Sequence, residues 1–282
     1  MPSPIIEKFW QDLVSDIQRN RITLPALPEI ALKARRLVNQ PDTTATELSK
    51  LVQTDVILST RLIRVANSPM YRTAKMVDTV KLAITRLGLK NVSNIITSLT
   101  MEQLYQTKLP KDIRKLVREN WLHGVHVAAI SQVIAARHRN LNNDEALLGG
   151  LIHDIGVLPI FEYSQLMPEF SNNPQALEKL VKVLHARLGG MILKSWKFSP
   201  DLISVAANHE TFDHEHSGLP DLTDVVTVAN LLSYVGTDHP HTQLNWGDIP
   251  AFQHLGMLPE ESIQVIHEAR DEIAEIRAML SS

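Results

Sequence analysis

The side chains best suited to chemistry in this sequence are its twelve histidines, eleven of which lie between His123 and His254. One of them is followed directly by an aspartate, and this pair, His153 and Asp154, interrupts the apolar, glycine-flanked run 149–156. Burying two such groups without partners costs several kcal/mol, so each needs a specific partner. Neighbours on a helix point about 100° apart, yet both tips can reach one ion that lies between them. The pair therefore predicts a site whose other members come from other helices.

Three further histidines are candidates for this site, namely His123, His185 and His209. Each lies in a predicted helix or at its end, among apolar residues. A set of nitrogen and oxygen ligands suits Zn, Fe or Mn, and an open coordination position would activate water. The alternative is that the histidines are structural and that no metal is bound.

Four other histidines form two pairs with one residue between the members, His214 with His216 and His239 with His241. Both pairs lie in polar sequence typical of loops. We therefore expect their side chains to be solvated and to lie outside the site.

Charge is distributed unevenly along the chain, although the net charge is only −3. Residues 61–120 carry twelve basic and four acidic side chains, whereas residues 201–282 carry two and fourteen. One interpretation is that these segments face each other within the fold or across a homodimer. The other is a patch for the phosphate of a nucleotide, for RNA or for an acidic partner. Its expected members are Arg61, Arg64, Arg72, Lys75 and Arg86.

The spacing of apolar residues and the cap signals predict an all-α, multi-helical fold. No glycine occurs before Gly88, which leaves few sites for the turns that β-hairpins need. Helices are expected from Pro4, with Ser3 as N-cap, and behind a capping box at 44–47. Others are expected over 58–66, over 80–87 with Gly88 at the end, over 92–99 and over 112–138. The last two begin at Asn143, as N-cap, and near Glu260, and the latter carries Ile263, Ile266, Ile273 and Ile276 on one side.

The run 107–110 is the best candidate for a boundary, because Pro110 disfavours helix at the preceding residue. We therefore divide the chain into an N-terminal helical half, 1–108, that packs on a second helical half, 109–282. The sequence has no cysteine, which excludes disulfides, a thiolate nucleophile and a cysteine-type zinc site. It has no signal-peptide pattern and no run of about 18 apolar residues. We expect a cytoplasmic protein without membrane contact.

An ordered series of motifs resembles the HD superfamily, and more closely its HDOD branch. In the first half these are LPALP (24–28), LVQTD (51–55), LIRVANS (62–68) and AITRLG (83–88). In the second half they are WLH (121–123), GLIHDIG (150–156) and HARLG (185–189). The resemblance covers about residues 22–230. It implies a bacterial signalling or regulatory module whose second half is related to metal-dependent phosphohydrolases.

By motif position, the resemblance implies that His123, the dyad His153–Asp154, His185 and His209 are metal ligands. Two positions depart from the catalytic pattern. Asn230 stands where active HD enzymes have a ligating aspartate, and an amide is a weaker ligand for a divalent cation. Val157 stands where HD-GYP phosphodiesterases have a lysine that would meet phosphate.

Three functions follow from these observations. The first is a regulatory module without catalysis, with a relict site that holds a metal or none, and with a protein partner in a signalling pathway. The second is a metal-dependent phosphohydrolase acting on a nucleotide or cyclic dinucleotide. The third is nucleotide or nucleic-acid binding without chemistry through the basic segment, which would be strongly salt-dependent.

Overall fold

The computed structural model describes residues 4–280, and every regular element in that range is a helix. The first part of the chain contains α1 (Pro4–Gln18), α2 (Glu29–Val38), α3 (Ala45–Val52), α4 (Val56–Ala66), α5 (Val80–Leu87), α6 (Leu89–Thr100) and the 3₁₀ helix η1 (Met101–Tyr105). The middle contains α7 (Lys111–Ala135), α8 (Asn143–Ile152), α9 (Val157–Ser164), α10 (Pro168–Ser171), α11 (Pro174–Ser195) and α12 (Pro200–Asn208). The last part contains α13 (Leu222–Ser233), η2 (Pro240–Gln243), η3 (Trp246–Asp248), α14 (Pro250–His254), α15 (Pro259–Glu268) and α16 (Arg270–Leu280). The all-α prediction is confirmed.

Side-chain caps fix most of the helix starts that the sequence signals. The expected capping box is present, since Thr44 accepts the backbone N–H of Glu47 and the Glu47 carboxylate accepts that of Thr44. The N-cap of α8 is Asn142, one residue before the asparagine that we expected, because its side chain accepts two backbone N–H groups of the first turn. Gly88 has φ +83° between α5 and α6, a conformation that other residues rarely adopt. Ser3, the expected cap of α1, lies outside the described residues.

Two helices end differently from the prediction. The single helix expected from Glu260 is broken at Ala269, which has φ −87° and ψ +13° and separates α15 from α16. The four isoleucines expected on one side are thereby divided, with the two in α16 buried and the two in α15 half-buried. The long helix α7 ends at Ala135 rather than at residue 138.

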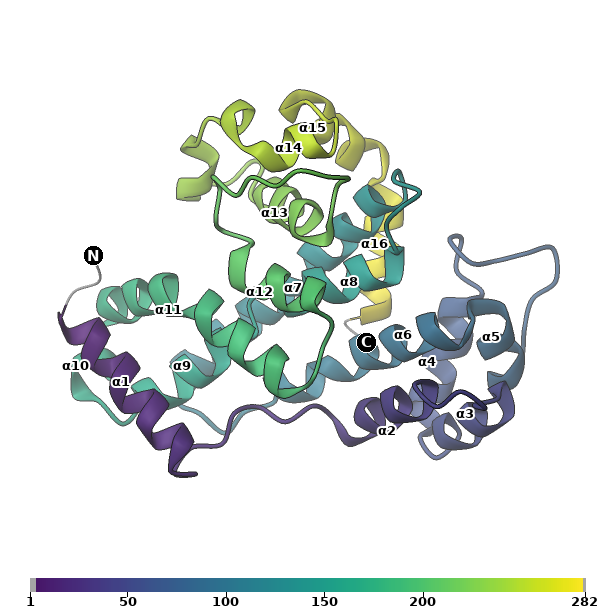
Figure 1. Ribbon diagram of the computed structural model, residues 1–282, viewed down its shortest axis with the longest axis horizontal. Helices are drawn as coiled ribbons and strands as arrows, with labels where there is room; N and C mark the ends of the chain where they lie inside the picture. The colour runs from purple at the N-terminus through teal and green to yellow at the C-terminus, as the bar shows by residue number, and fades with distance from the viewer. Residues whose placement is uncertain (1–3, 281–282) are drawn as a thin grey trace.

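Helices α7 and α8 form the centre of the molecule, and the other helices lie around them (Figure 1). Gly150 of α8 faces α7 so closely that a Cβ atom would lie 2.7 Å from Cα of Ala128. Helices α2 to α6 occupy one end of the molecule, and α13 to α15 lie above the centre in this view. The close approach of α7 and α8 matters for function, because these two helices carry His123 and the His153–Asp154 pair.

Helix α1 packs on the second half of the chain, although the division at residue 108 groups it with the first half. The Phe9 ring lies edge-on to Tyr163 and to Phe170, with both centroids 5.2 Å away. The Arg187 guanidinium of α11 lies 3.8 Å above the Trp10 ring. The segment after α1 then crosses to α2 at the other end of the molecule (Figure 1).

Two contacts join the first helices to α11 and the turn after it. The indole N–H of Trp196 donates to the carbonyl of Pro25 at 2.8 Å. The Arg35 guanidinium lies 3.6 Å above the Phe198 ring. A third contact, between the Tyr71 hydroxyl and the buried Asp144 carboxylate, joins the loop before α5 to the start of α8.

Two members of the expected basic patch are used by the fold. Arg61 donates to three backbone carbonyls, one at the end of α6 and two at the end of α16, at 2.9–3.0 Å. Arg86 donates to the carbonyl of Ala66 at 2.9 Å and to the loop that follows α4. Arg64, Arg72 and Lys75 are exposed. Arg61 and Arg86 therefore do not belong to the patch, because guanidinium groups held by carbonyls are not free to bind a ligand.

One apolar stretch, Asn143–Ser164, is long enough to cross a membrane by length and composition alone. It comprises α8 and α9, and 89% of its most apolar window is buried inside the protein. Core segments of globular proteins have the same properties, and this one carries the His–Asp pair.

Candidate metal centre

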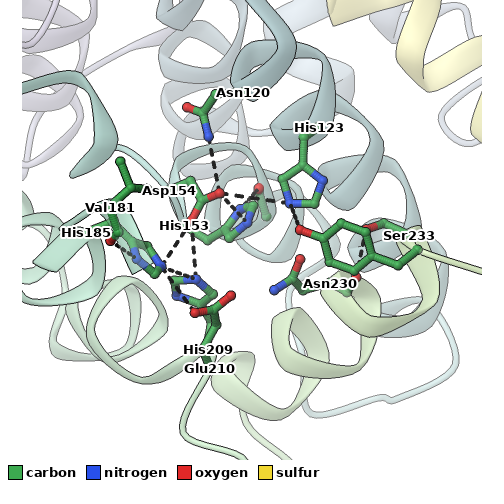
Figure 2. Close-up of polar contacts among 12 residues, drawn as sticks. Asn120, His123, His153, Asp154, Val181, His185, His209, Glu210, Asn230 and Ser233 are labelled. Carbon is green, nitrogen blue, oxygen red and sulfur yellow. Dashed lines mark hydrogen bonds and ion pairs between the residues drawn. The ribbon is translucent and has the colours of Figure 1, made fainter. Parts of the chain in front are cut away.

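Asp154 is the centre of the candidate site. It lies in the turn between α8 and α9, directly after His153, which ends α8. Four imidazole rings converge on its carboxylate (Figure 2): His123 from α7, His153, His185 from α11, and His209 at the end of α12. The structure thus brings together all five residues that the sequence singled out.

Three of these histidines are held in one tautomer by their own helices. In each, Nδ1 lies within hydrogen-bond distance of the backbone carbonyl three or four residues earlier. The distances are 2.7 Å for His153, 2.9 Å for His185 and 3.1 Å for His209. A carbonyl can only accept, so Nδ1 carries the proton and Nε2 presents a lone pair to the site. Metal-binding histidines are oriented in the same way.

The ligand atoms fall into two groups that share the Asp154 carboxylate. Oδ1 lies 3.3 Å from Nε2 of His209 and 3.4 Å from Nε2 of His185. Oδ2 lies 3.4 Å from Nε2 of His153 and 3.9 Å from Nε2 of His123. Within each group of three, the ligand atoms lie within 4.8 Å of one another. The carboxylate can therefore serve a cation on either side.

The Nε2 atoms of His185 and His209 are only 3.2 Å apart. Two lone pairs at this distance repel each other unless a proton or a cation lies between them. Burial alone would lower the pKa of His209, but its hydrogen bond to Asp154 and the charge of that carboxylate raise the pKa above its ordinary value. Without metal, therefore, a proton on His209 relieves the repulsion, and a divalent cation would take the place of that proton.

The two residues of the His153–Asp154 dyad differ in charge. Burial would raise the pKa of Asp154, but the surrounding histidines, His153 foremost, hold it well below its usual range. Burial lowers the pKa of His153 to about 3, so this ring is neutral at pH 7. The side chain of Asp154 is 18% exposed, and that of His153 is fully buried. An ionised carboxylate beside a neutral imidazole is the protonation state that a cation requires.

Several buried acceptors at the site have no hydrogen-bond partner among the described residues. They include Nε2 of His153 and the Oδ1 atoms of Asn120 and Asn230. Leaving a buried acceptor unpaired costs about 1–3 kcal/mol, so each calls for an explanation. A cation bound between the histidines and Asp154 would supply the missing partner of His153. The donor set of imidazole nitrogens and one carboxylate thus fits a divalent metal ion such as Zn, Fe or Mn.

The site also contains groups that sequence reasoning missed. Asn120 donates to Oδ2 of Asp154 at 3.2 Å, and its signal was its position one turn before His123 on α7. The Glu210 carboxylate lies 3.6 Å from Nε2 of His185. The Tyr234 hydroxyl lies 3.3 Å from Nε2 of His123, and the two rings are stacked. No local pattern marks Tyr234, because only the fold brings the end of α13 to α7.

The expectation that both spaced histidine pairs are solvated is wrong for His216, His239 and His241. His241 is buried, and its Nε2 lies 3.8 Å from Glu210 at the edge of the site. His239 stacks on Tyr234, with centroids 3.6 Å apart. Nε2 of His216 lies within hydrogen-bond distance of Oδ2 of the buried Asp224, at 2.9 Å. The polar sequence around these residues is indeed loop-like, but the loops fold back onto the protein and carry the rings inward.

A cavity of about 260 Å³ opens onto the site. Asp154 and His185 form part of its wall, together with Tyr234, His241 and the positively charged Lys182. Further lining comes from Val157, at the position where the sequence resemblance predicts a lysine in HD-GYP enzymes. The Asp154 carboxylate is thereby reached from solvent through a chamber that could hold a small ligand.

Several known proteins are similar to this chain. A protein of Treponema pallidum, described only as uncharacterised, is 21% identical over 236 residues, or 78% of this chain. This chain spans less than half, 44%, of that protein's length. A crystal structure from Shewanella amazonensis, described as a "Putative metal-dependent phosphohydrolase", is 24% identical with a TM-score of 0.81 and covers 98% of this chain and 99% of its own.

Two more solved structures share the fold. An HDOD domain protein with unknown function from Geobacter sulfurreducens is 23% identical, with a TM-score of 0.64 over 96% of this chain and 97% of its own. A "Putative signal transduction protein" from Marinobacter aquaeolei is 19% identical, with a TM-score of 0.59 over 98% of this chain and 66% of its own. The model of the HDOD domain matches residues 24–212, which is most of the chain. The chain therefore belongs to the HDOD family.

Proposed function

We propose that this protein is a regulatory HDOD module of a bacterial signalling pathway that holds a divalent metal ion at Asp154 without hydrolysing a substrate. The observation that carries the metal is the convergence of three Nε2 lone pairs on one carboxylate. Each ring is locked by its own helix, so the ligands are preorganised and little ordering is needed on binding.

The ligand set favours Zn, Fe or Mn over Mg or Ca, because imidazole nitrogen outnumbers carboxylate oxygen. When bound, such an ion supplies charge that lowers the pKa of a coordinated water. The residues of this chain hold the ligands in place: Asn120 orients Oδ2 of Asp154, and the carbonyls of α8, α11 and α12 orient the rings.

Two features support regulation rather than hydrolysis. Asn230 provides a neutral amide in place of a carboxylate, so the group formed by His123, His153 and Asp154 contains one negative charge. The Tyr234 hydroxyl lies against Nε2 of His123, and its ring covers that imidazole. The Tyr234 side chain therefore partly covers His123 on this side of the site. In this proposal the output is contact with another protein, and the opposite charges of 61–120 and 201–282 allow that protein to be a second copy of the chain.

A second candidate function is a phosphohydrolase acting on a nucleotide or cyclic dinucleotide. The cavity beside Asp154 supports it, because the group formed by Asp154, His185 and His209 faces a chamber that also contains Lys182. An ammonium group at that position can meet a phosphate oxygen. The retained carboxylate and histidines would then bind the metal beside that phosphate.

Metal content and turnover, measured on the same protein samples, distinguish these functions. The purified protein is loaded with Zn, Mn or Fe, freed of excess metal, and analysed for bound metal. It is then assayed against p-nitrophenyl phosphate, bis-p-nitrophenyl phosphate, nucleotides and cyclic dinucleotides. His153→Ala removes a central ligand, and His267→Ala, at an exposed position on α15, is the matched control.

We expect His153→Ala to hold less metal per chain than the wild type and His267→Ala, and no turnover in any sample. Metal-dependent turnover that His153→Ala abolishes would replace the regulatory proposal by the phosphohydrolase. A wild type that retains no metal after loading would overturn the metal centre and leave the histidines as structural residues.

A further inference from the structure

A second group of ligand-type side chains lies away from the centre at Asp154. Its core is Asp224, the third residue of α13, whose side chain is only 2% exposed. One of its oxygens, Oδ2, lies 2.9 Å from Nε2 of His216, and the other, Oδ1, lies 2.8 Å from Nδ1 of His254. The two imidazole rings face each other, with centroids 4.1 Å apart.

The three residues come from three separate elements. His216 belongs to the loop that joins α12 to α13, Asp224 to the first turn of α13, and His254 to the last residue of α14. The ligand atoms of all three lie within 4.8 Å of one another. The loop before α13 and the end of α14 therefore both contact one buried carboxylate.

Within the described part of the chain, the ion pairs of Asp224 are with these two histidines alone. The backbone N–H of Asp221 donates to Oδ2 at 3.1 Å, which completes the capping box of α13. In the described part of the chain, no lysine or arginine side chain neutralises this buried carboxylate. A divalent cation would neutralise the carboxylate and would also bind the nitrogens that point at it.

We propose that His216, Asp224 and His254 form a zinc site that is distinct from the centre at Asp154. The ligand atoms are Nε2 of His216, Nδ1 of His254 and the Asp224 carboxylate. Tetrahedral ligands about 2.1 Å from zinc are roughly 3.4 Å apart, so the separations of 2.8 and 2.9 Å need to widen by about half an ångström. The Asp221 carboxylate, 3.9 Å from Nε2 of His216 and 43% exposed, is available as a fourth ligand beside water.

The site has a structural role that does not depend on the proposed function. Only six residues separate His209 of the first site from His216 of the second, and Glu210 lies at the start of this loop. Zinc at the second site fastens the far end of the loop to α13 and α14. It thereby restrains the segment that places Glu210 beside His185.

A pair of near-isosteric substitutions separates zinc binding from hydrogen bonding. In His216→Gln the amide nitrogen takes the place of Nε2, and in His254→Asn the amide nitrogen takes the place of Nδ1. The double variant thus keeps both donors to Asp224 but loses both zinc ligands. His214→Ala is the matched control, because this neighbouring histidine is absent from the Asp224 ligand set.

Zinc stoichiometry is measured by elemental analysis after the protein has been equilibrated with zinc chloride and separated from free metal. We expect the double variant to hold one zinc per chain fewer than the wild type, and His214→Ala to hold the same number. The same loss is expected in the Asp154→Ala background, which removes the carboxylate shared by both ligand groups of the first centre. Cobalt substitution in that background should give the intense visible absorption of a tetrahedral ion.

Equal zinc content in the double variant and the wild type would overturn this site, whatever happens at Asp154. So would an Asp154→Ala protein that binds neither zinc nor cobalt and gains no thermal stability from zinc. Should the double variant not fold, His254→Asn alone is measured, since the loss of one of the three ligands already weakens the site. If the centre at Asp154 binds no metal, by contrast, the double variant should still hold one zinc per chain fewer than the wild type.

Discussion

Gly156 allows α9 and α11 to approach closely, and Gly156→Ala tests how strongly the metal centre depends on that approach. The residue has φ −66° and ψ −13°, which alanine adopts without strain, so any effect is steric. A Cβ atom at this position would lie 1.9 Å from the carbonyl oxygen of His185 and 2.6 Å from the backbone nitrogen of Gly189. Both neighbours are backbone atoms of α11, so no flexible side chain can move aside.

The size of the effect follows from this clash. Ordinary contact begins near 3.4 Å, so the distance to the His185 carbonyl must grow from 1.9 Å to at least 3.4 Å. A displacement of α11 of this order moves His185 away from Asp154, whereas a metal site tolerates only about 0.5 Å. Overpacking of this severity costs about 3 kcal/mol, which corresponds to a decrease in Tm of roughly 6 °C for a chain of this length.

The assay is thermal unfolding together with metal analysis of the loaded protein. Gly149→Ala is the control, because its Cβ would meet only side chains at ordinary contact distances, those of Leu202 at 3.4 Å, Val226 at 3.5 Å and Val205 at 3.7 Å. We expect Gly149→Ala to retain the wild-type Tm and metal content, and Gly156→Ala to lose both the stability and the metal held by His185 and His209. A Gly156→Ala protein with unchanged Tm and metal content would refute the argument that this contact positions His185.

Three further predictions concern other parts of the structure. Burial raises the pKa of Asp144 to about 6 from an ordinary 3.8, so the stability that its protonated form contributes is lost as pH rises through about 6. Asp144→Asn should abolish this loss of about 3 kcal/mol, and equal pH dependence of urea unfolding in both proteins between pH 4 and pH 7 would contradict it. Arg61→Met should lower stability by about 2–3 kcal/mol through three orphaned carbonyls, whereas exposed Arg64→Ala should change it by less than about 0.5 kcal/mol in the same urea titration. Asn230→Asp adds a charged ligand beside His123 and should tighten metal binding at least about tenfold. The affinity is measured by competition with a chelator, and an unchanged affinity would place Asn230 outside the site.

Much of the fold was predictable because helix signals are local. The capping box at Thr44 and the glycine at residue 88 fixed helix ends through hydrogen bonds and backbone preferences that depend on a few neighbouring residues. The break at Ala269 was not predictable in this way, because the isoleucine spacing continues across it. There the packing of α16 against α4 and α7 prevails over the local pattern.

The candidate site shows the same division between local and long-range information. His153 and Asp154 stood out because two polar residues interrupt an apolar run, and a buried pair must have partners. Tyr234 could not be found, because its role depends on the end of α13 lying over His123. The charge pattern of residues 61–120 was misleading for Arg61, because a basic residue that bonds to distant carbonyls looks the same in sequence as one that binds a ligand.

The residues that the family model matches do not coincide with the residues that fold together, as the packing of α1 shows. The match covers residues 24–212 and thus omits α1, whose Phe9 contacts Tyr163 and Phe170. It also omits α16, whose last carbonyls accept from Arg61. A fragment cut at the family limits would expose the apolar face that α1 covers and leave the half-buried Arg61 guanidinium short of two acceptors. Helices α1 and α16 therefore both contribute contacts to the same folded structure. We expect residues 4–280 to unfold as one cooperative unit.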